Sequence, residues 1–348
     1  MSFVQAMDAL DTVIKKSRVH LYKPIQIAEI LYRDRVFGDI DLTNLETYRS
    51  RSKSWRDDIS IRLLGRICNS SSKFQDDLFN AITPTQIAEL GAYNRAHNGA
   101  VEAYVYKRFM TKHSQLGDAL NYCLNANKDT FQVKTFIDSF WNEPGLKRSL
   151  DKIYEIVVYS LFSTLVDTLG LSVEISVNKD KIDILGEFED FTSKVMRLDY
   201  SALSCVQDAR VYRVGVTNAA DRGLDMYTNW GSAIQIKHLS LDVGLAEDIV
   251  NSVSSDKIVI VCKDAEKDVL VSVLTQIGWR SRIQSIVTEA DLVKWYEKAL
   301  RGKFSDEMGN KLISSLCEEI AEEFPSVNSL PEVLSSRHYE NIIDDILL

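Results

Sequence analysis

The first 140 residues carry apolar and polar positions with helical spacing. Residues 3–14 place apolar side chains three and four positions apart, the pattern of an amphipathic helix. Thr83 before Pro84 is typical of a helix start, because threonine caps free backbone amides and proline fits a first turn. The region 1–143 is therefore predicted to be all helical. Its further predicted helices cover residues 25–32, about 45–55, 59–67, 85–92, 99–109 and 115–124.

Pro144 and Gly145 break this pattern, and a different one follows. Residues 146–169 predict one long helix with a broad apolar face. Strands are predicted at residues 171–177, 180–188, 211–217, 233–239, 257–262 and 283–287, and helices at 245–253, 265–277 and 289–300. This alternation favours an α/β fold, with a mixed sheet flanked by helices over residues 144–302. Residues 303–348 are predicted to form an acidic helical tail that serves as a packing or dimer surface.

The stretch around Asp225 brings candidate chemistry to one place. Residues 233–239 alternate strictly, so Gln235 and Lys237 project from one face of a strand and the isoleucines between them from the other. Asn229 and Gly231 allow the chain to turn back as a hairpin. That pairing would place a carboxylate, an amide oxygen and an ammonium group together at a sheet edge.

These residues resemble the PD-(D/E)xK nuclease core, in which an acid ends one strand and acid-x-Lys follows on the next. Asp225 matches the first acid, Lys237 matches the lysine, and Gln235 stands where Glu or Asp is commoner. The order of helix, hairpin, helix and buried strand is the order that this core requires. Most of the chain resembles the HaeII-type restriction endonucleases. The resemblance is carried by four segments, AADRGLDM, IQIKHL, KSRVHLYKPIQIAEILYRDRV and SSKFQDDLF.

The resemblance implies a type II restriction endonuclease that cuts double-stranded DNA with Mg²⁺. It also implies a homodimer, a palindromic site of the form RGCGCY, and a methyltransferase that protects the host genome. Asp225, the amide oxygen of Gln235 and the carbonyl of Ile236 would bind the metal, and Lys237 would hold the attacking water.

A helix before the core sheet often supplies an additional acid in such nucleases. Glu155 is the candidate, because it is the only acid between Asp151 and Asp167 in a helix with a broad apolar face. A lone buried acid is costly unless it is paired or binds metal. Asp183 is a rival for the site acid and ranks below Asp225, because no acid-x-Lys strand follows it closely.

The net charge of −9 is unusual for a DNA enzyme, but the charge is unevenly distributed. Residues 15–66 hold twelve Lys or Arg against seven Asp or Glu, whereas residues 303–348 hold three against ten. The basic part can face phosphates while the acidic tail faces away. Candidate DNA contacts in the helical region are Arg49, Arg51, Lys53, Arg56, Lys73, Gln75, Asn94 and Arg95.

Other functional classes find little support. The five cysteines are scattered without zinc-ligand spacing, and no P-loop, HExxH or GxSxG motif is present. The sequence has neither an 18-residue apolar run nor a secretory signal, so we expect a cytoplasmic protein. Two alternatives remain open, a repair or junction-resolving nuclease on the same core and a non-catalytic DNA-binding protein in which Gln235 marks a degenerate site.

Overall fold

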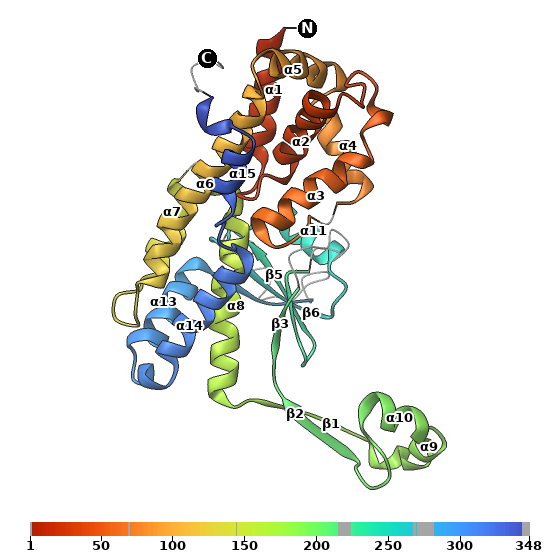
Figure 1. The fold of residues 1–348 in the computed structure, drawn as a ribbon. Coiled ribbons are helices and arrows are strands. Elements are labelled where there is room, and N and C mark those ends of the chain that lie inside the picture. The colour runs from red at the N-terminus through yellow and green to blue at the C-terminus, as the bar shows by residue number, and fades with distance from the viewer. Residues whose placement is uncertain are drawn as a thin grey trace.

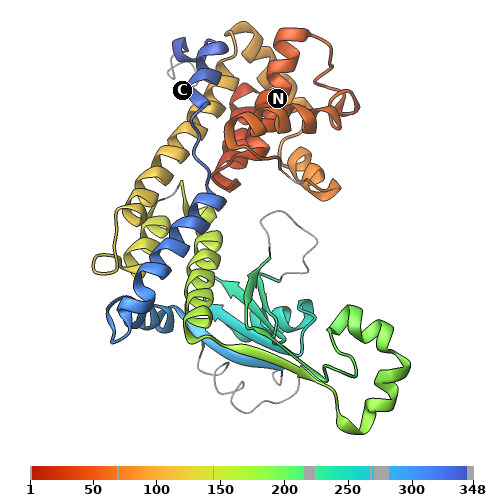
Figure 2. The same ribbon diagram turned by 60° about the horizontal axis from the view of Figure 1, so that its bottom comes forward.

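A helical bundle and an α/β body make up the protein, and a slender arm leaves the α/β body (Figures 1 and 2). The computed structural model describes residues 2–68, 70–143, 145–214, 224–266, 269 and 282–342. Within these ranges no helix is both long and apolar enough to cross a membrane.

The bundle confirms the predicted helical region. It contains α1 (Phe3–Lys16), α2 (Tyr22–Phe37), α3 (Arg51–Leu64), α4 (Ser72–Ala81), α5 (Pro84–Ala96) and the first half of α6 (Ala100–Leu124), with a 3-10 turn η1 (Leu45–Thr47). α5 begins as predicted, since the Thr83 hydroxyl accepts from the Gln86 amide and the Gln86 side chain accepts from the Thr83 amide. α4 was not among the predicted helices.

Helix α6 is a single 25-residue helix where the pattern predicted two. Its first half contributes Tyr106 and Phe109 to the bundle core, and its second half contributes Leu116 and Cys123 to the core of the α/β body. The apolar periodicity is interrupted where the helix passes from one core to the other, while the backbone continues. α7 (Val133–Asn142) follows it and packs on the same α/β core.

The α/β body is built on one five-stranded sheet. Its strands are β3 (Val211–Arg213), β4 (Met226–Thr228), β5 (Ser232–Lys237), β6 (Lys257–Cys262) and β7 (Ile283–Thr288), in spatial order β3-β4-β5-β6-β7. The first three pair antiparallel, and β5, β6 and β7 pair parallel. This mixed sheet confirms the predicted α/β class. The remainder of the predicted strand 211–217 and nearly all of the predicted helix 265–277 lie outside the described residues.

Helices cover both faces of the sheet. α8 (Leu150–Leu169), α13 (Glu289–Arg301) and α14 (Ser305–Glu323) share one core with Ile234 and Ile236, whereas α11 (Val243–Ser252) packs with Ala233 and Ile260 in another. β5 therefore sends alternate side chains to opposite faces, as the strict alternation predicted. A short 3-10 turn η2 (Lys147–Ser149) leads into α8.

The last segment returns to the bundle. α15 (Leu330–Ser336) and the 3-10 turn η5 (Tyr339–Asn341) place Leu330, Val333 and Tyr339 in the bundle core. The described end of the chain thus lies on the same body as the N-terminus (Figure 1). The segment that begins at residue 303 therefore packs on both bodies, since α14 lies on α8 and α15 on the bundle.

The arm separates α8 from the sheet along the chain. It consists of β1 (Ser172–Ser176), a 3-10 turn η3 (Lys179–Lys181), α9 (Ile182–Glu187), α10 (Glu189–Met196) and β2 (Ser204–Asp208), with β1 and β2 paired antiparallel. The strand predicted over residues 180–188 is wrong, because this stretch is helical. The short alternation of Ile182 and Ile184 suggested a strand, but the longer spacing through Phe188 and Phe191 is that of a helix.

Candidate active site

A tight hairpin joins β4 to β5 and sets the position of the candidate site. Met226 pairs with Ile234, and the Thr228 hydroxyl accepts from the Ser232 amide at 3.0 Å. Gly231 closes the turn with φ 96°, a conformation that favours glycine. Asp225 stands immediately before β4, so the hairpin carries it back beside the second half of β5.

Asp225 is bound directly to β5. Its Oδ2 atom accepts hydrogen bonds from Gln235 Nε2 at 2.5 Å and from the Ile236 backbone amide at 2.7 Å. A carboxylate without a proton can only accept, so the amide nitrogen of Gln235 must face Asp225. The amide oxygen, Oε1, is then left buried without a hydrogen-bond partner among the described residues, and the Gln235 residue is only 2% exposed.

Glu155 lies close enough to Asp225 to interact with its charge. This residue of α8 is 6% exposed, and Lys152 Nζ lies 2.8 and 2.6 Å from its two carboxylate oxygens. Burial raises the pKa of Glu155 to about 7, the charges of Asp225 and Asp151 add to the rise, and Lys152 opposes it. Compared with an ordinary value of 4.5, this favours the protonated form by about 3 kcal/mol.

The second carboxylate is perturbed in the same direction. Burial raises the pKa of Asp225, while the Ile236 amide and the ammonium groups of Lys237 and Lys152 lower it. Lys237 is partly exposed, and its ammonium group has no hydrogen bond or ion pair within the described part of the chain. Its charge therefore acts on Asp225 while its donors stay free for another group.

The residues present fit a divalent cation that prefers oxygen ligands. Two carboxylates that repel each other and a buried amide oxygen without a donor would all be relieved by one positive ion. The described residues contain no group of three or more His, Cys, Asp or Glu side chains suited to a metal, so the set depends on the Gln235 oxygen. The ligand role of the Ile236 carbonyl stays a prediction, since the contact of Ile236 with Asp225 is made by its backbone amide.

Three neighbours of the site were missed from the sequence. Lys152 holds Glu155, Asp151 forms an ion pair with Arg18 of the bundle, and His238 follows Lys237. Burial lowers the pKa of His238, although the charge of Asp151 opposes the shift, so its imidazole is neutral at pH 7. The spacing of Asp151, Lys152 and Glu155 along one helix face was the available signal.

Three of the predicted DNA contacts are interior residues, which corrects their assignment. Arg56 is 0% exposed and donates to Asp57 and Gln26, Gln75 is 1% exposed and accepts from Gln26, and Asn94 is 0% exposed and donates to Glu102. A side chain that is buried in this way offers no surface to DNA. Their polar groups instead satisfy one another inside the bundle.

The other predicted contacts lie on the surface or near it. Arg49 pairs with Asp76, Arg51 with Asp39 and Arg95 with Asp34. The hydrogen bonds from Arg33 and Arg51 hold the pKa of Asp39 well below its usual range. Lys53 is half-buried and Lys73 exposed. The rival acid Asp183 is exposed on α9 of the arm, apart from the sheet.

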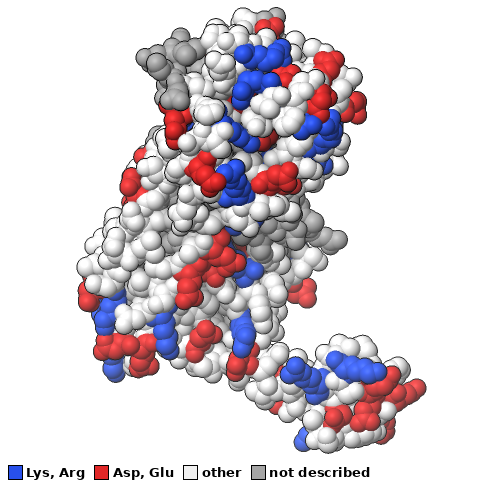
Figure 3. All heavy atoms as spheres, viewed as in Figure 1, with Lys and Arg blue, Asp and Glu red and all other residues white. Residues whose placement is uncertain are grey.

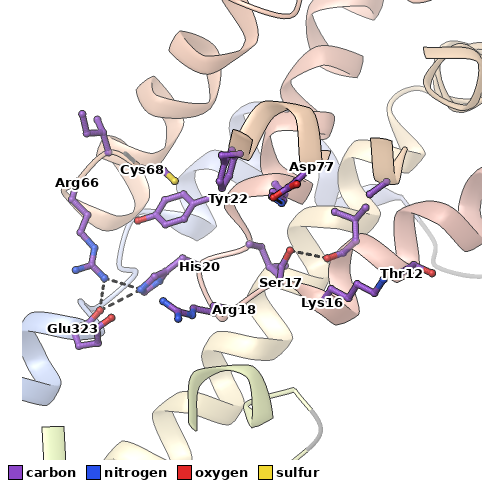
Figure 4. Close-up of a pocket in the computed structure, with 16 residues that line it drawn as sticks. Thr12, Lys16, Ser17, Arg18, His20, Tyr22, Arg66, Cys68, Asp77 and Glu323 are labelled. Carbon is purple, nitrogen blue, oxygen red and sulfur yellow. Dashed lines mark hydrogen bonds and ion pairs between the residues drawn. The ribbon is translucent and has the colours of Figure 1, made fainter. Parts of the chain in front are cut away.

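A basic pocket of about 550 Å³ lies on the bundle beside the candidate site (Figure 4). Lys16 lies at the end of α1, Arg18 in the turn that follows and Lys23 in the first turn of α2, and Arg66 enters just after α3. Burial, together with the charge of Arg66, lowers the pKa of His20 to about 3, so this wall residue is neutral. The ion pair of Arg18 with Asp151 connects the pocket to the first turn of α8.

The order of elements and the site define the class of protein. Helix α8, the antiparallel strands β3-β4-β5, helix α11 and the parallel strand β6 follow one another with Asp225, Gln235 and Lys237 on the hairpin, which is the arrangement of a restriction-endonuclease-like nuclease. Comparison with known proteins agrees. The profile of the family described as HaeII restriction endonuclease matches residues 6–339.

The chain belongs to this family of type II restriction enzymes and is a site-specific deoxyribonuclease. It is 54% identical over 343 residues to the type II restriction enzyme HaeII of Haemophilus aegyptius, with 97% of each chain covered. It is 56% identical over 332 residues to the type II restriction enzyme NgoBI of Neisseria gonorrhoeae, with 95% of this chain and 94% of the relative covered. No solved structure matches the chain significantly.

Replacing Gln235 with Glu should destabilise the metal-free protein. The substitution exchanges a donor for an acceptor 2.5 Å from Asp225, so two buried carboxylates would face each other. We expect a loss of ~2 kcal/mol, or roughly 5 °C in Tm, that added Mg²⁺ recovers. Thermal unfolding with EDTA and with Mg²⁺ measures this. The exposed Asn310→Asp on α14 is the control, and an unchanged metal-free Tm for Gln235→Glu would contradict the assigned hydrogen bond.

Glu155 should make metal binding depend on pH near neutrality. Its raised pKa gives a contribution to stability that is complete below 4.5 and is lost as the pH rises through about 7. The metal competes with that proton, so half-saturating Mg²⁺ should fall about tenfold between pH 6 and 8. Calorimetry across this range tests it, and Glu155→Gln should flatten both trends. The exposed Glu174→Gln should leave both unchanged, and a pH dependence that survives in Glu155→Gln would place the titrating group elsewhere.

Proposed function

We propose that the chain is a Mg²⁺-dependent endonuclease that cuts both DNA strands at a palindromic site of the form RGCGCY. It acts as a homodimer, and a methyltransferase of the same specificity protects the host. The observation that carries the metal-dependent chemistry is the unpartnered oxygen of Gln235, whose amide nitrogen donates to Asp225, together with the charge interaction between Asp225 and Glu155. The recognition site rests on the family resemblance.

The chain's own residues divide the reaction between them. When bound, Mg²⁺ neutralises phosphate charge and favours the hydroxide form of a water. Asp225 and Gln235 would hold the ion from the hairpin, and Glu155 would hold it from α8. Lys237 uses its free donors to place the attacking water and to stabilise the negative charge that develops on the phosphorus oxygens. Lys152 keeps Glu155 oriented, and it opposes the protonation that burial favours.

Cleavage of a plasmid of known sequence tests the proposal directly. Purified protein with Mg²⁺ should give discrete fragments whose ends all lie within RGCGCY, and EDTA should prevent the cutting. A smear, or nicks that follow DNA structure, would favour a repair or junction nuclease on the same core. Sequence-specific binding without cleavage under any divalent cation would favour a non-catalytic role.

Lys237→Ala should lower the cleavage rate roughly a hundredfold or more while it leaves specific DNA binding intact. The lysine faces the water and the phosphate, whereas sequence is read at base edges. Cleavage kinetics and gel-shift assays in Ca²⁺ separate the two effects. Lys257→Ala is the matched control, because Lys257 is exposed at the opposite end of the parallel pair β5-β6. Lost binding with cleavage retained would refute the role of Lys237.

The DNA backbone is proposed to pass the basic pocket on its way to the site. Asp151 and Glu155 are four residues apart on α8, which is ~6 Å along the helix axis. Arg18, paired with Asp151, therefore lies near the phosphate next to the one that is cut. Lys16, Lys23 and Arg66 line the same pocket with Asp77 as the opposing acid, since the Glu323 carboxylate pairs with Arg213.

Removing these cations should weaken the salt dependence of DNA binding. In a Lys237→Ala background, Lys16→Ala with Lys23→Ala should flatten the slope of log K against log salt by ~0.9 for each lost phosphate contact. The comparison is Arg49→Ala with Arg51→Ala, whose cations pair closely with Asp76 and Asp39 and should contribute less, whereas Lys23 is 4.0 Å from its acid, Asp77. Equal slopes for the pocket variant and the unmodified background would remove the pocket from the DNA path.

A further inference from the structure

The arm, defined as residues 172–208, has almost no core of its own. Figure 2 shows it projecting from the α/β body as a two-stranded ribbon with α9 and α10 at its tip. Its buried large apolar side chains are Leu185 and Leu198, and neither belongs to the three hydrophobic clusters of the described residues. An isolated two-stranded hairpin and helices this short are marginally stable in water.

Exposed apolar side chains are concentrated on the arm. Of twenty-two large apolar residues that are exposed in the described parts of the chain, eight lie on it, although it spans only about a tenth of the sequence. They are Ile175, Ile184, Phe188, Phe191, Val195, Met196, Tyr200 and Val206. Contiguous apolar surface of this kind on a soluble protein marks an interaction site.

These side chains lie on the tip of the arm and on both faces of its ribbon. The tip exposes Ile184 on α9, Phe188 at the junction of the two helices, and Phe191 and Val195 on α10, so both short helices contribute apolar side chains. On the hairpin, Ile175 pairs with Cys205 and lies on the same face as Val173 and Gln207, whereas Val206 lies on the opposite face with Glu174. Nothing in the described part of the chain covers either face.

The apolar surface continues at the root of the arm. Asn229 Nδ2 donates to the Asp208 carbonyl at 2.8 Å and its Oδ1 accepts from the Arg210 amide at 2.9 Å, so the β4-β5 turn is attached to the end of β2. Beside it, Tyr212 and Tyr227 stack at 5.0 Å and remain 38% and 44% exposed. The arm is therefore joined directly to the hairpin that holds Asp225.

We infer that the arm is the dimerisation element, which packs its exposed apolar side chains on a second copy of this chain. The inference rests on the homodimer proposed above. One chain holds one cluster of Asp225, Gln235 and Lys237 among its described residues, whereas a double-strand cut needs two. A two-fold axis that pairs the arms supplies both sites in a fixed relation.

The available surface matches what such a contact needs. Half of a large aromatic side chain is ~100 Å², so these eight side chains, distributed over the tip and both faces of the ribbon, expose at most about 800 Å² per chain, which is comparable to the area of a standard stable interface. DNA is the poorer occupant, because phosphates need cationic donors and the arm carries eight Asp or Glu against four Lys or Arg. Figure 3 shows both signs of charge over the arm, with uncharged atoms between them.

Solution mass measurements on the full chain test the inference. Sedimentation of the wild type should give about 79 kDa, twice the 39.5 kDa of one chain. Phe191→Asp with Val195→Asp should raise the dimer dissociation constant by at least about a hundredfold and give the mass of one chain. Ile175→Asp, on the ribbon, should act in the same direction. The matched control is Val4→Asp with Ile61→Asp, which are equally exposed on the bundle and should leave the dimer intact.

Each outcome decides between occupants. A monomeric wild type, or arm variants that stay dimeric, would overturn the inference. Arm variants that stay dimeric but lose DNA binding would show a DNA contact instead. The variants should fold, because all the substituted side chains are exposed. Circular dichroism checks that they do. Lys237→Ala should remain dimeric, so failure of the catalytic proposal is distinguishable from failure of the interface.

Discussion

The hydrogen bonds to Asp225 are the interaction on which the site depends. One carboxylate oxygen accepts from the Gln235 side chain and from the Ile236 backbone, and this joins the strand that carries the acid to the strand that carries the lysine. Burial makes both this acid and Glu155 reluctant to ionise. Ionising these two buried carboxylates is therefore unfavourable without a nearby positive charge. A bound cation would favour their ionised forms, so metal binding and carboxylate protonation would be linked.

The two ends of the Gln235 side chain have different surroundings. The nitrogen end donates to Asp225, and the oxygen end is buried without a hydrogen-bond partner among the described residues. A glutamate at this position supplies only acceptors and would need a proton or a cation against Asp225. Gln235 in place of the commoner Glu or Asp is thus consistent with an active site. The replacement removes one negative charge and makes the metal-free state more stable.

The two bodies are joined on the side where the site lies. α6 runs through both cores, Arg18 reaches Asp151 on α8, and the segment after α14 returns to the bundle. Acidic side chains gather over α14 in Figure 3, whereas basic groups of α1, α2 and the turn between them line the pocket next to α8. The net charge of −9 therefore coexists with a local group of basic side chains near α8.

The sequence by itself determined the α/β class, the long helix with Glu155 and the hairpin with Asp225, Gln235 and Lys237. Alternation and turn residues are local signals, and a strand's period assigns its faces without knowledge of its partners. Only the tertiary structure decided that Arg56, Gln75 and Asn94 are interior, because burial depends on which helices pack together. It also decided that residues 180–188 form part of an arm, and that Glu155 of α8 lies close enough to Asp225 to interact with its charge. Burial and the approach of Glu155 to Asp225 arise from contacts between segments distant in the chain, which no local pattern encodes.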